Sequence, residues 1–277
     1  MKRLLTTIVP VILASSAFAG YSVDLPIVAG LQGVSTRFYT SLDITNWTTQ
    51  ATDVSFEYIS TDYTVEAHGT LVTGVGGHGN FHTDDIIAFL ASKGFLTADQ
   101  AKNSKGTLLL TFTNPAFLEG SEATATVRTY NFLTTGQTPS VGYSYRGFVV
   151  RGEGSHTVSA VIGDTSTAGG GVPVVITNLG VEDVGVNDQG QVDTGPVTVQ
   201  LTFYDPASGN QVGPQPTVTL RSGQVTQINN VWTTYNLSHT AQNLLVTMTE
   251  TAGTAQIRGY VILKDVSTND GSIFFAQ

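Results

Sequence analysis

The sequence predicts an all-β protein made of two tandem β-sandwiches, each with at most one or two short helices. Three observations predict it. Apolar and polar residues alternate over short stretches, clusters of turn-forming residues separate these stretches, and three short motifs occur twice in the same order. The chain has 277 residues, which is enough for two domains of ordinary size.

Residues 1–19 have the form of a signal peptide. Lys2 and Arg3 make a basic start, residues 4–14 are apolar but too few to span a bilayer, and Ala17-Phe18-Ala19 has the small residues that signal peptidase requires. We expect cleavage after Ala19, with an uncleaved anchor as the alternative. The mature chain is then secreted, to the cell surface or the extracellular space, with the periplasm as the alternative compartment. We expect no transmembrane segment in it.

Composition excludes several classes of function. The chain has no cysteine, so disulfides, thiol catalysis and thiolate metal sites are absent. Its formal charge is −9, and loss of Lys2 and Arg3 with the signal makes it −11, so nucleic acid and anionic lipid are not expected partners. Charged residues are only 12% of the chain, and Thr, Gly and Val are abundant, as is typical of β-structure with many turns.

In the first half, residues 54–58 alternate between apolar and polar, which predicts a strand with one buried face. The glycine-rich residues 74–77 predict a turn. Asp84 and Asp85 before an apolar run, with Gly94 after it, predict one short capped helix, and residues 99–102 add a further turn of helix. In the second half, residues 197–203 alternate in the same way, and Asn230 stands where a second cap would be.

The repeated motifs divide the chain. The tripeptide Ile-Thr-Asn occurs at residues 44–46 and 176–178, and Leu-Leu-Leu-Thr-Phe-Thr at 108–113 matches Leu-Leu-Val-Thr-Met-Thr at 244–249. Arg128 and Arg258 each stand two residues before a tyrosine in the third match, which predicts equivalent positions on equivalent strands. With a glycine-rich linker near residue 152, the domains are expected at residues 20–151 and 152–277.

A resemblance to known proteins rests on further motifs. These are Leu-Pro-Ile-Val-Ala at residues 25–29, Thr-Arg at 36–37, Leu-Asp-Ile-Thr-Asn at 42–46, Arg-Thr-Tyr-Asn at 128–131 and the ending at 265–277. With them the chain resembles secreted bacterial proteins that have two tandem immunoglobulin-like β-sandwich domains and mostly no assigned function. The resemblance implies the immunoglobulin-like fold and carries over no catalytic residues.

An acidic segment breaks the symmetry of the repeat. Residues 180–195 form an insertion in the second half, and we expect a loop there. Calcium prefers several carboxylate and carbonyl oxygens, so Glu182, Asp183, Asp188 and Asp193 are a candidate calcium site. Their spacing does not match an EF-hand, and a solvated acidic loop is the alternative. We expect no other cofactor.

Other residues were weighed for chemistry. His78 and His82 precede two aspartates, but in a strand they would lie about 13 Å apart, so a polar hairpin edge is favoured over a zinc site. No nucleophile elbow or phosphate loop is present in the sequence. Paired carboxylates stay open because their pairing is spatial. Trp47 and Trp232 are expected in the core, with a sugar platform as the alternative.

These observations favour a non-enzymatic surface, matrix or adhesion module. A carbohydrate-binding protein is the first alternative, and a secreted hydrolase with an unrecognised carboxylate site is the second. The expected partner is a protein or glycan at the cell surface, or a second copy joined through edge strands such as the uncharged residues 271–277.

Overall fold

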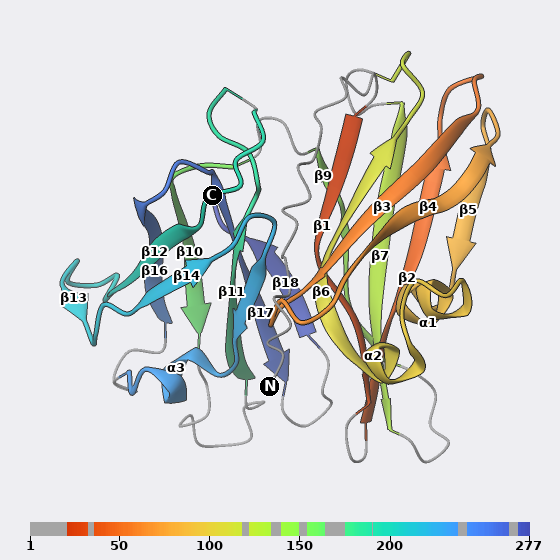
Figure 1. Cartoon of the computed structure of the whole chain (residues 1–277). Coiled ribbons are helices and arrows are strands. Elements are labelled where there is room, and N and C mark those ends of the chain that lie inside the picture. The colour runs from red at the N-terminus through yellow and green to blue at the C-terminus, as the bar shows by residue number, and fades with distance from the viewer. Residues whose placement is uncertain are drawn as a thin grey trace, which may run out of the picture.

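The computed structural model describes residues 21–32, 36–117, 122–133, 140–149, 154–163, 175–189, 191–237, 243–265 and 271–277. Over these ranges the chain has an all-β sandwich fold of antiparallel sheets (Figure 1). The predicted signal peptide and the predicted boundary between residues 151 and 152 lie outside the described residues. We call residues 21–149 the first half and residues 154–277 the second half.

The first half is one sheet of nine strands that turns around its own core. Its path is β4-β3-β6-β1-β2-β7-β8, with β5 added beside β2 and β9 beside β1. β1 pairs with β6 along most of its length and with β2 only at its end, from Gly30 to Gln32. β1 therefore connects the β4-β3-β6 part of the sheet to the β2-β7-β8 part. The elements are β1 (Tyr21–Gln32), β2 (Thr36–Asn46), β3 (Thr52–Ser60), β4 (Glu66–Val75), β5 (Asn80–Thr83), α1 (Ile86–Ser92), α2 (Ala98–Lys102), β6 (Asn103–Phe112), β7 (Ala123–Leu133), β8 (Ser140–Arg146) and β9 (Phe148–Val149).

The second half consists of two separate sheets. One has the order β10-β16-β12-β13, with β14 also on β12, and the other has the order β15-β11-β17-β18. Its elements are β10 (Thr157–Gly163), β11 (Val175–Asp183), β12 (Val197–Tyr204), β13 (Gln211–Val212), β14 (Thr217–Leu220), β15 (Val225–Ile228), α3 (Val231–Thr234), β16 (Asn243–Ala252), β17 (Ile257–Asp265) and β18 (Gly271–Phe275).

The pairing scheme of the first half recurs in the second. β2 lies between β5 and β7 as β11 lies between β15 and β17, and β7 and β17 are each followed by one further strand, β8 and β18. β6 lies between β1 and β3 as β16 lies between β10 and β12. The two halves therefore share one order of strand pairing, which supports the duplication read from the sequence.

For two of the three repeated motifs, the matched residues are not at equivalent positions when the halves are aligned by their strand pairing. These are the motif with Arg128 and Arg258 and the Ile-Thr-Asn motif. Asn46 faces Ala123, the first residue of β7, just as Asp183 faces Ile257, the first residue of β17. Likewise, Thr45 faces the first residue of β5, and Glu182 faces the first residue of β15. Arg258 thus occupies the place of Thr124, and Arg128 lies four residues farther along its strand. The predicted equivalence of the two arginines is wrong in position, although β7 and β17 are corresponding strands.

The Ile-Thr-Asn match fails for the same reason. It ends β2 in the first half but lies at the start of β11 in the second. The mismatch is an odd number of residues, so Ile44 points into the core whereas Ile176 faces the first half. A tripeptide that is typical of strands does not determine at which position of a strand it lies.

Each of the three helices begins at a residue whose side chain caps it, and the sequence analysis predicts the caps at Asp85 and Asn230 but not the one at Thr97. The Asp85 carboxylate accepts a hydrogen bond from the Ala88 N–H and begins α1. Thr97 begins α2 with a capping box. Asn230 begins α3 at the place that corresponds to Asp85. These three helices have seven, five and four residues, and no helix in the described ranges has the length and apolarity needed to cross a bilayer.

Two main cores form, and the first extends across the boundary between the halves. The first is built around buried side chains such as Leu25, Leu110 and Phe112, and it also includes Val225, Tyr260 and Ile262 of the second half. The second lies between the two sheets of the second half, where Trp232 is buried. The two halves are therefore packed against each other through side chains that water does not reach.

Candidate functional site at the interface of the halves

Three charged side chains meet inside the interface. Asp24 projects from β1 of the first half, and Glu182 and Arg258 project from β11 and β17 of the second half. One guanidinium nitrogen of Arg258 donates to Asp24 and also to Glu182, the latter at 2.8 Å. All three side chains are buried, so the group is a closed ionic cluster that joins the halves.

Burial sets the protonation of this cluster. Burial and the adjacent Asp24 carboxylate raise the pKa of Glu182 well above its usual range, against the lowering effect of Arg258. Burial lowers the pKa of Arg258, but the two carboxylates raise it by more, so the guanidinium stays charged. Arg258 also lies over the Phe148 ring, with its guanidinium carbon 4.4 Å from the ring centre.

The local sequence explains why Glu182 is in a strand. Residues 180–183 were predicted to belong to a loop, and this is wrong, because β11 continues through Asp183. The predicted insertion begins at Gly180, but this glycine permits a close approach between strands, because a Cβ there would lie 2.0 Å from the Tyr260 ring. Leu179 and Val181 on either side point into the core.

The four calcium candidates do not form one site in the described structure. Glu182 faces Arg258, and the Asp183 carboxylate accepts from the Gly185 N–H at 2.7 Å. The Asp188 carboxylate contacts His156 at 2.9 Å, and Asp193 accepts from the Gly195 N–H at 2.8 Å. No group of three histidine or acidic side chains suited to a metal occurs among the residues that the structure describes. Calcium binding by the remaining loop stays a prediction, which a calcium-dependent rise in melting temperature that Asp188→Ala abolishes would support.

Two of the histidines, His82 and His156, have carboxylate partners. His82 lies between Asp43 at 2.7 Å and Asp84 at 3.0 Å, and the hydrogen bonds to Asp84 and Asp43 raise its pKa. His78 is in the turn between β4 and β5, with φ 56°. β5 pairs with β2 and β4 pairs with β3, so the predicted hairpin at this point is wrong. The contact from His156 to Glu250 could not be predicted from local sequence, because these residues are 94 positions apart.

The two tryptophans differ in whether their predicted burial is correct. Trp232 is buried as predicted, but Trp47 is 58% exposed, so its predicted core position is wrong. It lies just beyond the end of β2, and its Nε1–H donates to Thr124 at 3.3 Å.

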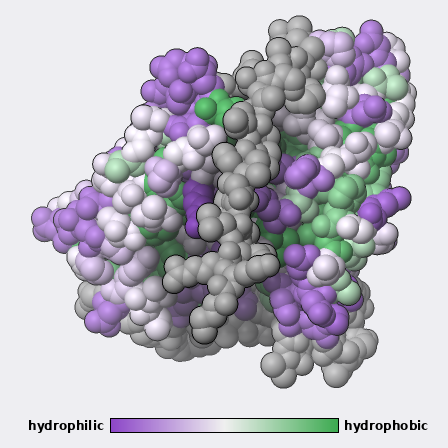
Figure 2. All heavy atoms as spheres, in the orientation of Figure 1, coloured by the Kyte–Doolittle hydropathy of each residue, from purple (hydrophilic) through white to green (hydrophobic). Residues whose placement is uncertain are grey.

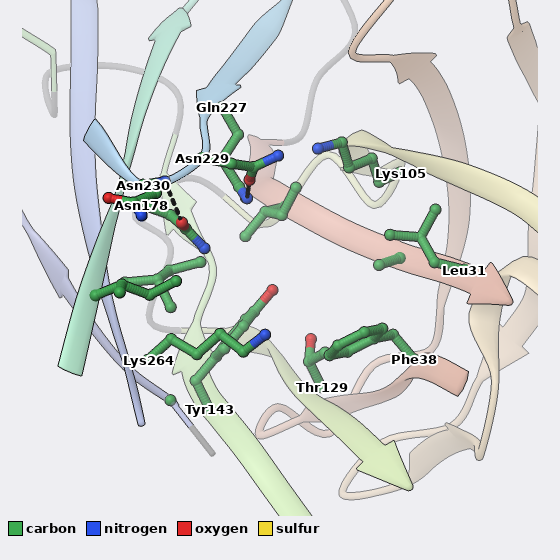
Figure 3. Close-up of a pocket in the computed structure, with 15 residues that line it drawn as sticks. Leu31, Phe38, Lys105, Thr129, Tyr143, Asn178, Gln227, Asn229, Asn230 and Lys264 are labelled. Carbon is green, nitrogen blue, oxygen red and sulfur yellow. Dashed lines mark hydrogen bonds between the residues drawn. The ribbon is translucent and has the colours of Figure 1, made fainter. Parts of the chain in front are cut away.

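A pocket of about 330 Å³ opens between the two halves. Figure 3 shows Lys105 and Lys264 extending into it from opposite sides, Lys105 from β6 and Lys264 from β17. The walls are otherwise apolar or uncharged, and no acidic residue lines them. The full lining is Ile27, Ala29, Leu31, Phe38, Lys105, Thr129, Tyr143, Ile176, Asn178, Gln227, Asn229, Asn230, Ile262, Lys264 and Gly271.

A second pocket, of about 470 Å³, holds two glutamates of the first half, Glu57 and Glu66. Burial and then the charge of Glu66 raise the pKa of Glu57, which is the direction a general acid needs. Arg221 of the second half closes one side, with its guanidinium carbon 4.6 Å from the centre of the Tyr63 ring.

Comparison with known proteins adds little. No protein-family model matches the chain, and no curated protein does. Among solved structures, a red sea bream transglutaminase aligns over 91% of this chain and 30% of its own length, at 6% identity and a TM-score of 0.16. The C-terminal domain of the Streptococcus pyogenes antigen I/II-family protein AspA aligns over 93% of this chain and 99% of its own, at 11% identity and a TM-score of 0.14. The chain spans less than a third of the transglutaminase, and TM-scores this low carry no argument about fold or function.

Proposed function

We propose that this protein is a secreted, non-enzymatic surface, matrix or adhesion module built from a duplicated β-sandwich. The observation that carries the proposal is one sheet face of the second half. On β10, β12, β14 and β16 the inward positions are apolar, and the outward positions form a face without a charged side chain, which we call the threonine face. It comprises Thr157, Ser159, Val161, Thr198, Gln200, Thr202, Tyr204, Thr217, Thr219, Leu245, Thr247 and Thr249.

Its residues lie in rows across the strands. Thr157 faces Thr249, which faces Gln200 on the next strand, and Val161 faces Leu245. Val161 is 62% exposed and Leu245 is 36% exposed. In Figure 2 the visible surface of the second half is mostly pale, with strongly hydrophilic groups toward its periphery. A neutral, hydroxyl-rich sheet on an acidic protein suits contact with an uncharged surface, because no buried charge has to be desolvated.

The interface adds rigidity. A module that bears load or presents a face needs its parts fixed, and the ionic cluster of Asp24, Glu182 and Arg258 holds the halves together. Secretion itself rests on the predicted signal peptide at residues 1–19.

The test is adhesion of the purified protein to the surface and matrix of cells that secrete it. Thr247→Arg with Thr249→Arg puts two charges on the threonine face and is expected to reduce binding at least about tenfold without lowering the melting temperature. Thr70→Arg with Thr73→Arg, at exposed positions of β4 in the first half, is the matched control. Equal binding by both double variants would contradict the proposal.

Carbohydrate binding is the second candidate, and exposed Trp47 favours it. An indole face on the surface can stack on a sugar ring, and Thr124 orients its N–H. A glycan array with Trp47→Ala as the control separates this candidate from the first.

A hydrolase is the third candidate, favoured by Glu57 and Glu66 in the second pocket. Asp24 and Glu182 are also close carboxylates, but both bind Arg258 and neither lines the two pockets described above. Release of sugars from a glycan mixture that Glu57→Gln abolishes would favour it over both binding functions.

A further inference from the structure

The geometry points to a binding site for a small organic carboxylate with an apolar body in the pocket that contains Lys105 and Lys264. This goes beyond adhesion by the threonine face, which lies on a different sheet, so either function can fail without the other. The pocket volume of about 330 Å³ is at the lower end of the range for small-molecule sites.

The charge of the pocket is the first argument for an anionic ligand. The whole chain has 21 acidic residues against 12 lysines and arginines, yet this pocket has two lysines and no acidic residue. Lys105 and Lys264 form no ion pair with any residue that the structure describes, whereas Lys102 nearby in sequence pairs with Asp99. Two unpaired ammonium groups in one pocket of an acidic protein call for an anion.

The surroundings of the two lysines strengthen this argument. Burial lowers the pKa of Lys105 and the pKa of Lys264, so each ammonium group has lost part of its hydration. A bound carboxylate would replace that hydration by a charge-assisted hydrogen bond and reverse the cost of burial.

The amides of the pocket favour the same ligand. The Asn178 side-chain oxygen already accepts from the Asn230 N–H at 2.9 Å, and the Asn229 side-chain oxygen accepts from Gln227 at 2.6 Å. Each oxygen has therefore used one of its two lone pairs, whereas each side chain still has two amide N–H donors to offer a ligand. The pocket therefore presents mainly donors, which suit a carboxylate and not a cation.

The apolar walls set the rest of the ligand. Ile27, Ala29 and Leu31 of β1 line one side, and Ile176 and Ile262 line the other. They have no polar side-chain atoms to satisfy, so the body of the ligand is expected to be a hydrocarbon chain or ring. A fully polar anion such as phosphate would leave these walls in contact with water.

The test uses the full mature chain and decanoate as the probe, with decanol as its uncharged counterpart, in isothermal titration calorimetry at neutral pH. We expect one decanoate per chain, and an affinity at least about tenfold higher than that of decanol, since one charge-assisted contact contributes about that factor. This comparison needs no variant. Equal affinities for the two probes, or no uptake of decanoate at about 1 mM, would overturn the proposal.

Variants locate the site. Lys105→Gln and Lys264→Gln should each weaken decanoate binding about tenfold and leave decanol binding unchanged, while Lys105→Arg retains it. Lys102→Gln removes the same charge outside the pocket and is the matched control. Weaker decanoate binding by Lys102→Gln, or unchanged decanoate binding by both pocket variants, would overturn the assignment. Either result would show that decanoate is attracted to positive charge on the surface in general.

Discussion

Single residues at the interface bring charge into a place that excludes water. Asp24 and Glu182 share one nitrogen of Arg258, while the second oxygen of Asp24 and two nitrogens of Arg258 have no hydrogen-bond partner in the structure. Such a cluster is costly to assemble, and its stability depends on all three members being present. The cluster therefore fixes how the halves meet more than it raises their stability.

Loss of the arginine alone should be severe. Arg258→Met leaves two buried carboxylates without a counter-charge, and we expect it to lower the free energy of unfolding by about 3–5 kcal/mol in urea denaturation. The triple variant Asp24→Asn, Glu182→Gln, Arg258→Met should recover most of that loss, since no buried charge remains. Arg128→Met, at an exposed position of β7, is the control and should change stability by less than about 0.5 kcal/mol. A single variant as stable as the parent would show that water reaches the cluster.

Stability should peak at mildly acidic pH. Burial raises the pKa of Asp183 to about 7, so between about pH 4 and pH 7 the folded chain keeps a proton that the unfolded chain has lost, and stability falls as pH rises through this window. The hydrogen bond to Glu250 raises the pKa of His156, which adds stability below its unfolded pKa that is lost as pH rises through the folded value. We expect the melting temperature to be higher near pH 5 than at pH 8, and Asp183→Asn to flatten this slope. A melting temperature that rises from pH 5 to pH 8 would contradict the assignment.

At the scale of elements, the sequence was sufficient where a signal is local. Alternation located the strands, and Asp85 and Asn230 located two helices, because capping depends on neighbours three residues away. Register was not predictable in this way, because a strand moved by an even number of residues keeps the same face buried. Arg258 showed this, since its pattern fitted Arg128 while its place is that of Thr124.

The candidate site was largely beyond prediction from sequence. Asp24 and Arg258 are 234 positions apart, and Lys105 and Lys264 lie on strands of different halves, so their proximity comes from how two sheets stack. Glu182 was identified as a candidate residue, but for calcium, because it lies in an acidic segment that has no counterpart in the first repeat. One signal was available: lysines among the apolar residues of predicted strands are unusual in an acidic chain with few basic residues.

The last strand makes a prediction at this scale. β18 pairs with β17, and Phe275 packs against Phe148 with ring centres 4.4 Å apart. Phe275→Ala should lower the free energy of unfolding by about 2–4 kcal/mol, whereas adjacent Phe274→Ala should change it little, because Phe274 is 54% exposed. Deletion of residues 273–277 should destabilise the second half further. A truncated protein that stays fully stable but loses higher oligomers in light scattering would instead favour assembly through this edge.

At the scale of the whole molecule, two similar halves form one body. The outer face of one sheet of the second half, with Tyr260 and Ile262, is part of the first core, as Figure 1 shows by β17 and β18 lying between the halves. Gln224 of the second half also donates to the Thr61 carbonyl of the first at 2.8 Å. Contacts of this kind limit independent motion of the halves.

Heating should therefore give one transition. In differential scanning calorimetry we expect a single peak whose calorimetric and van't Hoff enthalpies agree, since unfolding of either half exposes the core of the other. Residues 154–277 expressed alone should melt at a lower temperature, because Val225, Tyr260 and Ile262 lose their cover. Two separate peaks for the full chain would mean that the interface is too weak to couple the halves.

The long separation between Asp24 and Arg258 also has a kinetic consequence. Because Asp24 and Arg258 are 234 positions apart, we expect their contact to form late in folding, after β1 has paired with β6 and β17 with β11. Interactions absent from the transition state for folding act on the rate of unfolding, so replacing Arg258 should hasten unfolding and leave the refolding rate nearly unchanged. On the proposal that the chain is secreted, the buried ions would then set how long a folded molecule lasts outside the cell.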